Sequence, residues 1–261
     1  MSRRFLACLV VAGLGTLQPG AQAQAPAPQV HTIRLSLSNV HLIQAPAGRA
    51  VLIDAGGKDD IDALAAALHS HGVAWRDIGA VVVTHGHSDH AGLAAEIRRR
   101  SDAAIVLGRG DVAMAAAGHN DELKPTNFTA RLLMRFAIDP VYEAFAADIV
   151  VDDKLDLARF GLSGRVRQVP GHTPGSLVVE LADGRAFVGD MVLGGALGGT
   201  LWPTRAGEHY FHADRARNAG NIAELLRQRI TRFYLGHGGP VSRESVVEAF
   251  GAPAAVPAAT R

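Results

Sequence analysis

The chain has 261 residues, of which 48% are hydrophobic and 20% are charged, as in an ordinary globular protein with one sizeable domain or two small ones. Its formal net charge is +1, and its lysines and arginines are scattered along the sequence. This pattern offers no basic face, so we expect no nucleic-acid partner.

The first 23 residues have the order of a secretory signal peptide. Two arginines at positions 3 and 4 precede an apolar run over residues 5–17, and small residues follow at positions 21–23. The run is shorter than the roughly 20 apolar residues that a membrane span needs, so we expect no stable membrane anchor. We predict cleavage near Ala23 or Ala25 and a periplasmic or secreted mature protein.

The rest of the chain divides into one domain with short ends. Residues 24–29 are rich in Ala, Pro and Gln and are predicted to be a flexible lead-in, residues 30–250 the domain, and residues 251–261 a flexible tail. The only cysteine, Cys8, lies in the predicted signal peptide, so the mature protein is expected to contain no disulfide and no thiolate site.

The N-terminal half of the domain alternates strand and helix patterns. Residues 31–38, 40–43 and 50–54 are predicted to form an antiparallel meander, and residues 59–71 have the apolar spacing of a helix. A strand over residues 80–83, a helix over 91–100, a strand over 103–107 and a helix over 111–117 follow. This alternation indicates an α/β fold.

A dense cluster of polar side chains follows the apolar run at residues 80–83. His85, His87, Asp89 and His90 lie within six residues, at the point where a buried strand enters a glycine-containing turn. Imidazole and carboxylate groups are the ligands that zinc and similar ions accept. The stretch therefore predicts a metal site. Asp54, at the end of an earlier predicted strand, is either a partner behind that site or an ordinary turn residue.

The C-terminal half is less regular at first. Residues 118–148 are either an insertion that forms a pocket wall or a pair of packing helices. Strands are predicted at residues 149–152, 165–169, 177–181, 186–189 and 233–235, and helices at 213–229 and 242–250.

Three single residues at strand ends repeat the metal-ligand chemistry. His172 lies between two Pro/Gly pairs, Asp190 ends a strand, and His237 is flanked by glycines after a strand. A backbone held rigidly on both sides is what a ligand needs. The glycine-rich residues 194–207 are predicted to be a loop or connector, and Trp202, His209 and Tyr210 are candidate pocket residues.

This set of residues resembles the metallo-β-lactamase superfamily, whose His-x-His-x-Asp-His signature appears here over residues 85–90. The resemblance covers about residues 30–250 and implies an αββα four-layer sandwich with its metals at one edge. It also implies the ligands: His85, His87 and His172 on one metal, Asp89, His90 and His237 on the other, and Asp190 bridging the two. The implied cofactors are two Zn²⁺ ions, with Fe or Mn as alternatives, and Asp89 and Asp190 are expected to be catalytic.

The implied activity is hydrolysis of an ester, lactone or thioester of a small molecule by a metal-bridging hydroxide. True β-lactamases of this superfamily usually lack the bridging aspartate, so Asp190 disfavours β-lactam cleavage, which stays an alternative. Glutathione thioesters are less expected, because members that bind glutathione carry a C-terminal helical extension and only residues 238–261 follow His237. A second alternative is an oxidoreductase that resembles the mono-iron persulfide dioxygenases, which share the fold.

Overall fold

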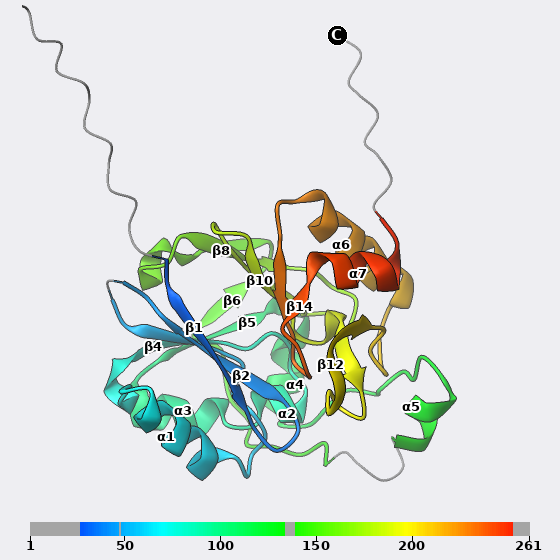
Figure 1. Ribbon diagram of the computed structural model, residues 1–261. Coiled ribbons are helices and arrows are strands. Elements are labelled where there is room, and N and C mark those ends of the chain that lie inside the picture. Colours follow the sequence, from blue (N-terminus) through cyan, green and yellow to red (C-terminus); the bar gives the residue numbers. More distant parts are fainter. Residues whose placement is uncertain (1–26, 47, 134–138, 253–261) are drawn as a thin grey trace, which may run out of the picture.

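The computed structural model describes residues 27–46, 48–133 and 139–252, so the predicted signal peptide and most of the predicted tail lie outside the described residues. Two six-stranded sheets face each other, and helices cover the outer face of each sheet (Figure 1). The predicted αββα sandwich is therefore confirmed. None of the helices in these ranges is long and apolar enough to cross a membrane.

The first sheet is built from the N-terminal half of the chain. Its strands follow one another in the order β1 (Gln29–Arg34), β2 (Asn39–Gln44), β3 (Ala50–Ile53), β4 (Ile78–Val82), β5 (Ala104–Gly108) and β6 (Ile149–Val151). The first two pairings are antiparallel, which confirms the meander, and the last three are parallel. The parallel strands end at the same edge of the sheet, and the loops beyond them carry the polar cluster.

The apolar strands of this sheet are buried on both faces. In β3, Leu52 packs toward the helices α1 (Ile61–Ser70), α3 (Ala94–Ser101) and α4 (Val112–Ala117), whereas Val51 and Ile53 pack toward the second sheet. Because successive side chains of a strand point to opposite faces, a strand covered on both sides has to be apolar throughout. This explains the continuous runs in the sequence.

The second sheet is built from the C-terminal half. Its order is β14 (Val241–Ser242), β13 (Arg232–Tyr234), β10 (Arg185–Phe187), β9 (Leu177–Leu181), β8 (Gly164–Gln168) and β7 (Lys154–Asp156). The helices α6 (Arg215–Arg227) and α7 (Arg243–Phe250) cover its outer face through a third apolar core (Figure 1). Ser242 caps α7, as expected, by accepting a hydrogen bond from the Ser245 N–H.

Three details differ from the expected elements. The edge strands β7 and β14 were not predicted, because they are only three and two residues long and two of the three residues of β7 are polar. The glycine-rich residues 194–207 are not a loop: they form most of a separate hairpin of β11 (Leu193–Ala196) and β12 (Leu201–Gly207). The predicted helix over residues 91–100 is divided into α2 (Ser88–Ala91) and α3.

The remaining elements are α5 (Phe128–Leu133) and the 3₁₀ turns η1 (Trp75–Asp77), η2 (Arg109–Asp111), η3 (Leu157–Phe160) and η4 (Gly189–Met191).

Candidate metal centre

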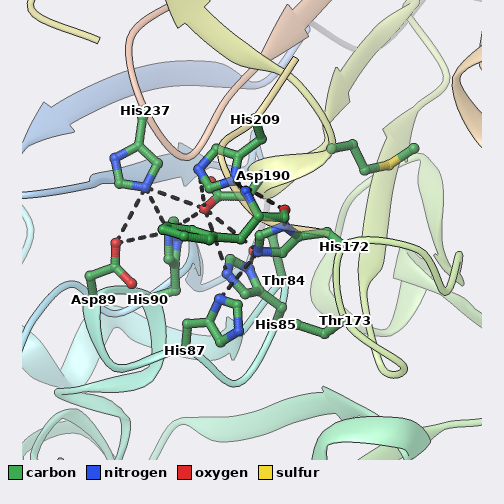
Figure 2. A network of polar contacts seen from close by, with 12 residues as sticks. Thr84, His85, His87, Asp89, His90, His172, Thr173, Asp190, His209 and His237 are labelled. Carbon is green, nitrogen blue, oxygen red and sulfur yellow. Dashed lines mark hydrogen bonds and ion pairs between the residues drawn. The ribbon is translucent and has the colours of Figure 1, made fainter. Parts of the chain in front are cut away.

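The residues singled out at four separate strand ends meet at one place in the fold. The loop after β4 carries the first four, and the loops after β8, β10 and β13 carry His172, Asp190 and His237 (Figure 2). All seven side chains point toward one centre at the edge of the two sheets. Segments more than 140 residues apart are thus brought within hydrogen-bonding distance, as for His90 and His237.

The first group of side chains, here called the imidazole group, consists of His85, His87 and His172. Their ring nitrogens lie within 4.8 Å of one another, an arrangement that could hold a metal ion. The Nδ1 atom of His87 lies 3.2 Å from Nε2 of His172. All three residues are buried, and their rings meet edge to face.

The second group, here called the mixed group, consists of Asp89, His90 and His237. The Oδ2 atom of Asp89 lies 3.5 Å from Nε2 of His90 and 3.3 Å from Nε2 of His237. The two Nε2 atoms are 3.3 Å apart. These three atoms could hold a second ion.

Asp190 lies between the two groups. Its Oδ2 atom is 3.7 Å from the Nε2 atoms of both His85 and His172, and 3.4 and 3.3 Å from those of His90 and His237. One carboxylate oxygen thus faces both groups at similar distances. Two neighbouring dications repel each other, and an anion between them lowers that repulsion.

Hydrogen bonds within the cluster do not satisfy all of its nitrogen and oxygen atoms, whereas metal ions would. In the described part of the chain, only four buried side-chain nitrogen or oxygen atoms have no hydrogen-bond partner, and two of them, His85 Nε2 and Asp190 Oδ1, belong to this cluster. Leaving such atoms unpaired is costly unless another partner binds them. Nitrogen and carboxylate oxygen together suit Zn²⁺, Fe²⁺ and Mn²⁺.

The ring atoms that face away from the centre are anchored. Nδ1 of His172 donates to the Phe211 carbonyl (2.8 Å), and Nδ1 of His237 donates to the Leu37 carbonyl (2.7 Å). Nδ1 of His85 lies 3.1 Å from the Thr84 hydroxyl. A proton on Nδ1 leaves Nε2 with a free lone pair, which is the state that a metal ligand needs.

His90 is anchored by Asp54, whose role the sequence left open. Nδ1 of His90 lies 3.0 Å from Asp54 Oδ2, and the two carboxylate oxygens also accept hydrogen bonds from the Thr84 N–H (2.6 Å) and hydroxyl (3.0 Å). Asp54 itself adopts a left-handed backbone, with φ of 66°. This strained conformation aims its carboxylate behind the cluster, so Asp54 is a partner of the site and not merely a turn residue.

Asp111 supports the imidazole group in a comparable way, and sequence reasoning missed it. This fully buried carboxylate accepts hydrogen bonds from the Gly86 N–H (2.9 Å), the Gly175 N–H (2.7 Å) and the Thr173 hydroxyl (2.7 Å). It therefore ties together the two loops that carry His85, His87 and His172. In the sequence it appears only as the first residue of a helix, and nothing there marks its partners.

The imidazole group is uncharged at neutral pH. Burial lowers the pKa of His87 to about 4 and lowers the pKa values of His85 and His172 well below their usual range. These rings can therefore accept a metal ion without first losing a proton.

The mixed group is charged before any metal binds. Burial opposes a proton on His237, but Asp190 and Asp89 outweigh this effect and raise the pKa of that imidazole to about 10. In the same way Asp190, Asp89 and Asp54 raise the pKa of His90 above its usual range. Protons thus occupy the positions that a second ion would take.

A pocket of about 400 Å³ leads from the solvent to the cluster. Polar residues of the cluster line its floor: His87, Asp89, Asp190, His209 and His237. Apolar side chains dominate its walls, namely Leu37, Leu123, Val141, Leu193, Leu197 and Phe211. At the rim, Lys58 and Asp139 form an ion pair of 2.5 Å that neutralises both charges. The pocket therefore suits a substrate with an apolar body and a polar reacting group.

The three candidate pocket residues have different places. His209 and Tyr210 line the pocket, and Nε2 of His209 lies only 3.1 Å from Asp190 Oδ2. Trp202 does not line it: this residue lies on β12 near an irregularity of the hairpin, with φ of 51°, and its side chain is 68% exposed. The backbone turn directs the indole into solvent, which corrects the expectation for Trp202.

Comparisons with known proteins agree with this geometry. A model of the metallo-beta-lactamase superfamily matches residues 33–237. The chain is 32% identical over 157 residues to a hydroxyacylglutathione hydrolase of Anaeromyxobacter dehalogenans, matching 60% of this chain and 47% of that protein, so it spans about half of that relative. It is 24% identical to the probable metallo-hydrolase YflN of Bacillus subtilis, over 69% of this chain and 70% of that one.

A solved structure extends the likeness to three dimensions. The metallo-beta-lactamase family protein TTHA1429 of Thermus thermophilus superposes with a TM-score of 0.60, covering 84% of this chain and 77% of that one, at 22% identity.

Proposed function

The chain belongs to the metallo-β-lactamase superfamily, and we propose that it is a binuclear metal-dependent hydrolase that cleaves an ester, lactone or thioester with an apolar body. The observation that carries this proposal is the position of Asp190, whose Oδ2 atom lies between two complete groups of ligand atoms at the floor of an apolar pocket.

The proposed ligands are those of the two groups. His85, His87 and His172 would hold one ion, and Asp89, His90 and His237 the other, with Asp190 shared. Bound divalent ions, with zinc as the first choice, would supply Lewis acidity and lower the pKa of a water molecule. The chain's own contribution is to hold the ligand atoms in place, through the contacts of Asp54, Asp111 and the backbone carbonyls.

Among the residues that the structure describes, no serine or cysteine of this cluster is paired with a base. No cysteine occurs after residue 8. The one serine in the cluster, Ser88, donates its hydroxyl proton to the Asp139 carbonyl (2.7 Å) and has no base beside it in a nucleophile–histidine pair. We therefore propose direct attack by water, without an acyl-enzyme.

The substrate class draws support from two sides. The apolar walls favour a neutral, hydrophobic acyl group or ring, and the ion pair of Lys58 with Asp139 leaves no unpaired charge of that pair for a charged substrate. The relative from Anaeromyxobacter is named for a thioester substrate, which supports the thioester within the proposed class.

A substrate panel on one metal-loaded preparation tests the proposal. We expect hydrolysis of at least one class among lactones, alkyl and aryl esters and thioesters, its loss with a chelator and its return with Zn²⁺, Mn²⁺ or Fe²⁺. Cleavage restricted to β-lactams, or oxygen consumption with a persulfide and one iron per chain, would replace the proposal with one of the two alternatives. Inactivity on the whole panel with two metals bound would refute it.

The absence of an acyl-enzyme has its own measurement. With an aryl ester, product release should be linear from the first turnover, and Ser88→Ala should keep most of the wild-type rate. A burst of alcohol equal to the enzyme concentration would reveal a covalent intermediate instead.

We also propose that the protein is exported. The support is the charged, apolar and small-residue order of residues 1–23. N-terminal sequencing of the protein from the periplasm of an expression host should begin near Gln24 or Pro26, whereas an intact Met1 on soluble protein would contradict export.

A further inference from the structure

His209 lies close enough to His172 and Asp190 for the three to hold a metal ion, but it differs from four of the five proposed histidine ligands in what its Nδ1 atom meets. In His85, His90, His172 and His237 this atom faces an oxygen that can accept a proton. In His209 the Phe211 N–H donates to Nδ1 at 3.3 Å. An Nδ1 atom that accepts a hydrogen bond carries no proton, so in the neutral ring the proton sits on Nε2.

The Phe211 carbonyl does not reverse this assignment. It lies 3.4 Å from Nδ1 of His209, farther than the N–H, and it already accepts the Nδ1–H of His172 at 2.8 Å. The backbone N–H and carbonyl of Phe211 thus place the ring proton on Nδ1 in His172 and on Nε2 in His209. His172 is left with a free lone pair on Nε2, whereas His209 is left with an N–H group.

The Nε2–H of His209 points at the floor of the pocket. It lies 3.1 Å from Asp190 Oδ2, and the residue lines the pocket although it is only 5% exposed. The ring is held by stacking on His237 (5.6 Å between centroids) and by an edge-to-face contact with His172 (4.9 Å). The Thr126 hydroxyl also donates to the carbonyl oxygen of His209 at 2.9 Å. The donor is therefore oriented before any substrate arrives.

We propose that His209 is a catalytic residue that donates a hydrogen bond from Nε2 to the substrate oxygen on which negative charge develops during acyl transfer. The kinetic part of this inference rests on the proposed hydrolase function. A fixed donor stabilises such charge without reorganisation, and loss of one donor typically lowers kcat by about 10² to 10³.

Nitrogen-15 NMR of the histidine side chains in the cadmium-113-loaded protein tests the donor without turnover. We expect His209, assigned by the loss of its signals in His209→Gln, to show a protonated Nε2 with no coupling to cadmium. The proposed ligands should show that coupling. Hexanoate, a carboxylate with an apolar tail, should shift the His209 Hε2 resonance downfield. Cadmium coupling at His209, a proton on Nδ1, or no response to hexanoate would overturn the proposal.

Kinetics on any ester-type substrate that the wild type cleaves provides the second arm. His209→Ala should lower kcat by about 10² to 10³, with KM within about threefold and metal content unchanged. His209→Gln, whose amide N–H can still donate, should recover part of the loss. The control is His69→Ala, at an exposed position on α1, and it should behave as wild type. Unchanged kcat or lost metal in His209→Ala would overturn the inference. A wild type that cleaves no ester would instead refute the proposed function, and the NMR arm would still decide on the donor.

Discussion

The two halves of the centre both offer ligand atoms for a metal ion, but they differ in the charge of their side chains. The imidazole group consists of neutral, deeply buried rings and is ready for an ion, whereas the mixed group pairs carboxylates with imidazolium ions that neutralise them. The difference follows from the placement of the carboxylates, because Asp54 and Asp89 both lie beside His90. Before an ion binds, protons on the histidines therefore balance the carboxylate charges of the mixed group. The histidines of the imidazole group carry no charge, because burial lowers their pKa values. We therefore expect the ions to bind with different affinities and different pH dependence.

Removing the residue that both halves share should have the largest effect. Asp190→Asn keeps the size of the side chain but removes the negative charge that faces five histidines. We expect metal content below two per chain and a loss of kcat/KM greater than about 10², since even partners of ligands are worth about 10 to 100-fold. Elemental analysis and the ester assay measure both. Asp183→Asn, in the exposed β9–β10 turn, is the matched control. Two retained metals with activity within tenfold would mean that Asp190 does not serve both groups.

Removing a ligand of only one half should separate the two ions. Asp89→Ala takes the carboxylate from the mixed group and leaves the imidazole group untouched, so metal content should fall from about two toward one, with turnover reduced by about 10²-fold or more. The remaining ion should keep its wild-type affinity in a chelator competition. Unchanged stoichiometry would show that the assignment of the mixed group is wrong.

Asp54 and Asp111, which hold the ligands in place, should each affect the affinity for one of the two ions, by less than the loss of a ligand does. Asp54→Asn weakens the contact to His90, and Asp111→Asn weakens the link between the loops of the imidazole group. Each should cost about 10 to 100-fold in affinity for one ion only. A cobalt titration with two resolved steps reads out which step moves. The comparison fails if both variants weaken the same step.

Proton release should show the smallest but most direct difference. His237 has a raised pKa of about 10 and His90 a raised pKa, so both hold protons at pH 7 and must lose them when an ion binds to the mixed group. Affinity there should rise with pH, up to about tenfold per unit for each proton released. The imidazole group should change little above pH 5, since the pKa of His87 is about 4. Calorimetry in buffers of different ionisation enthalpy counts the protons for each ion. Equal release in both steps would contradict the different charge states.

The local pattern of the sequence indicated the alternation of strands and helices and marked the candidate ligands at strand ends. The four-layer sandwich and the assignment of the ligands to two metals were implied by the resemblance to the metallo-β-lactamase superfamily. The hairpin at 194–207 was missed because its glycines look like loop residues, although they serve a close backbone approach: a Cβ on Gly195 would lie 1.9 Å from the Leu201 carbonyl oxygen. Short-range patterns do not contain that kind of contact.

The supporting shell was the part that sequence could not provide. Gly86 and Gly175 lie 25 and 64 residues away from their partner Asp111 in the sequence, and only the assembled fold brings the three together. The same holds for the proton position in His209, which depends on a single peptide N–H. Asp54 was recognised as a candidate because it ends a strand beside the metal loop, but its contact with His90 required the structure.

Phe211 separates two tasks within one residue. Its N–H and carbonyl hold His209 and His172 through the backbone, while its side chain forms part of the pocket wall. A substitution at this position changes the shape of the wall but leaves both backbone groups in place, except for proline, which would lose the N–H. Substitutions at position 211 can therefore change which substrates are accepted, in evolution or under laboratory selection. They do so without moving the histidines of the reacting centre.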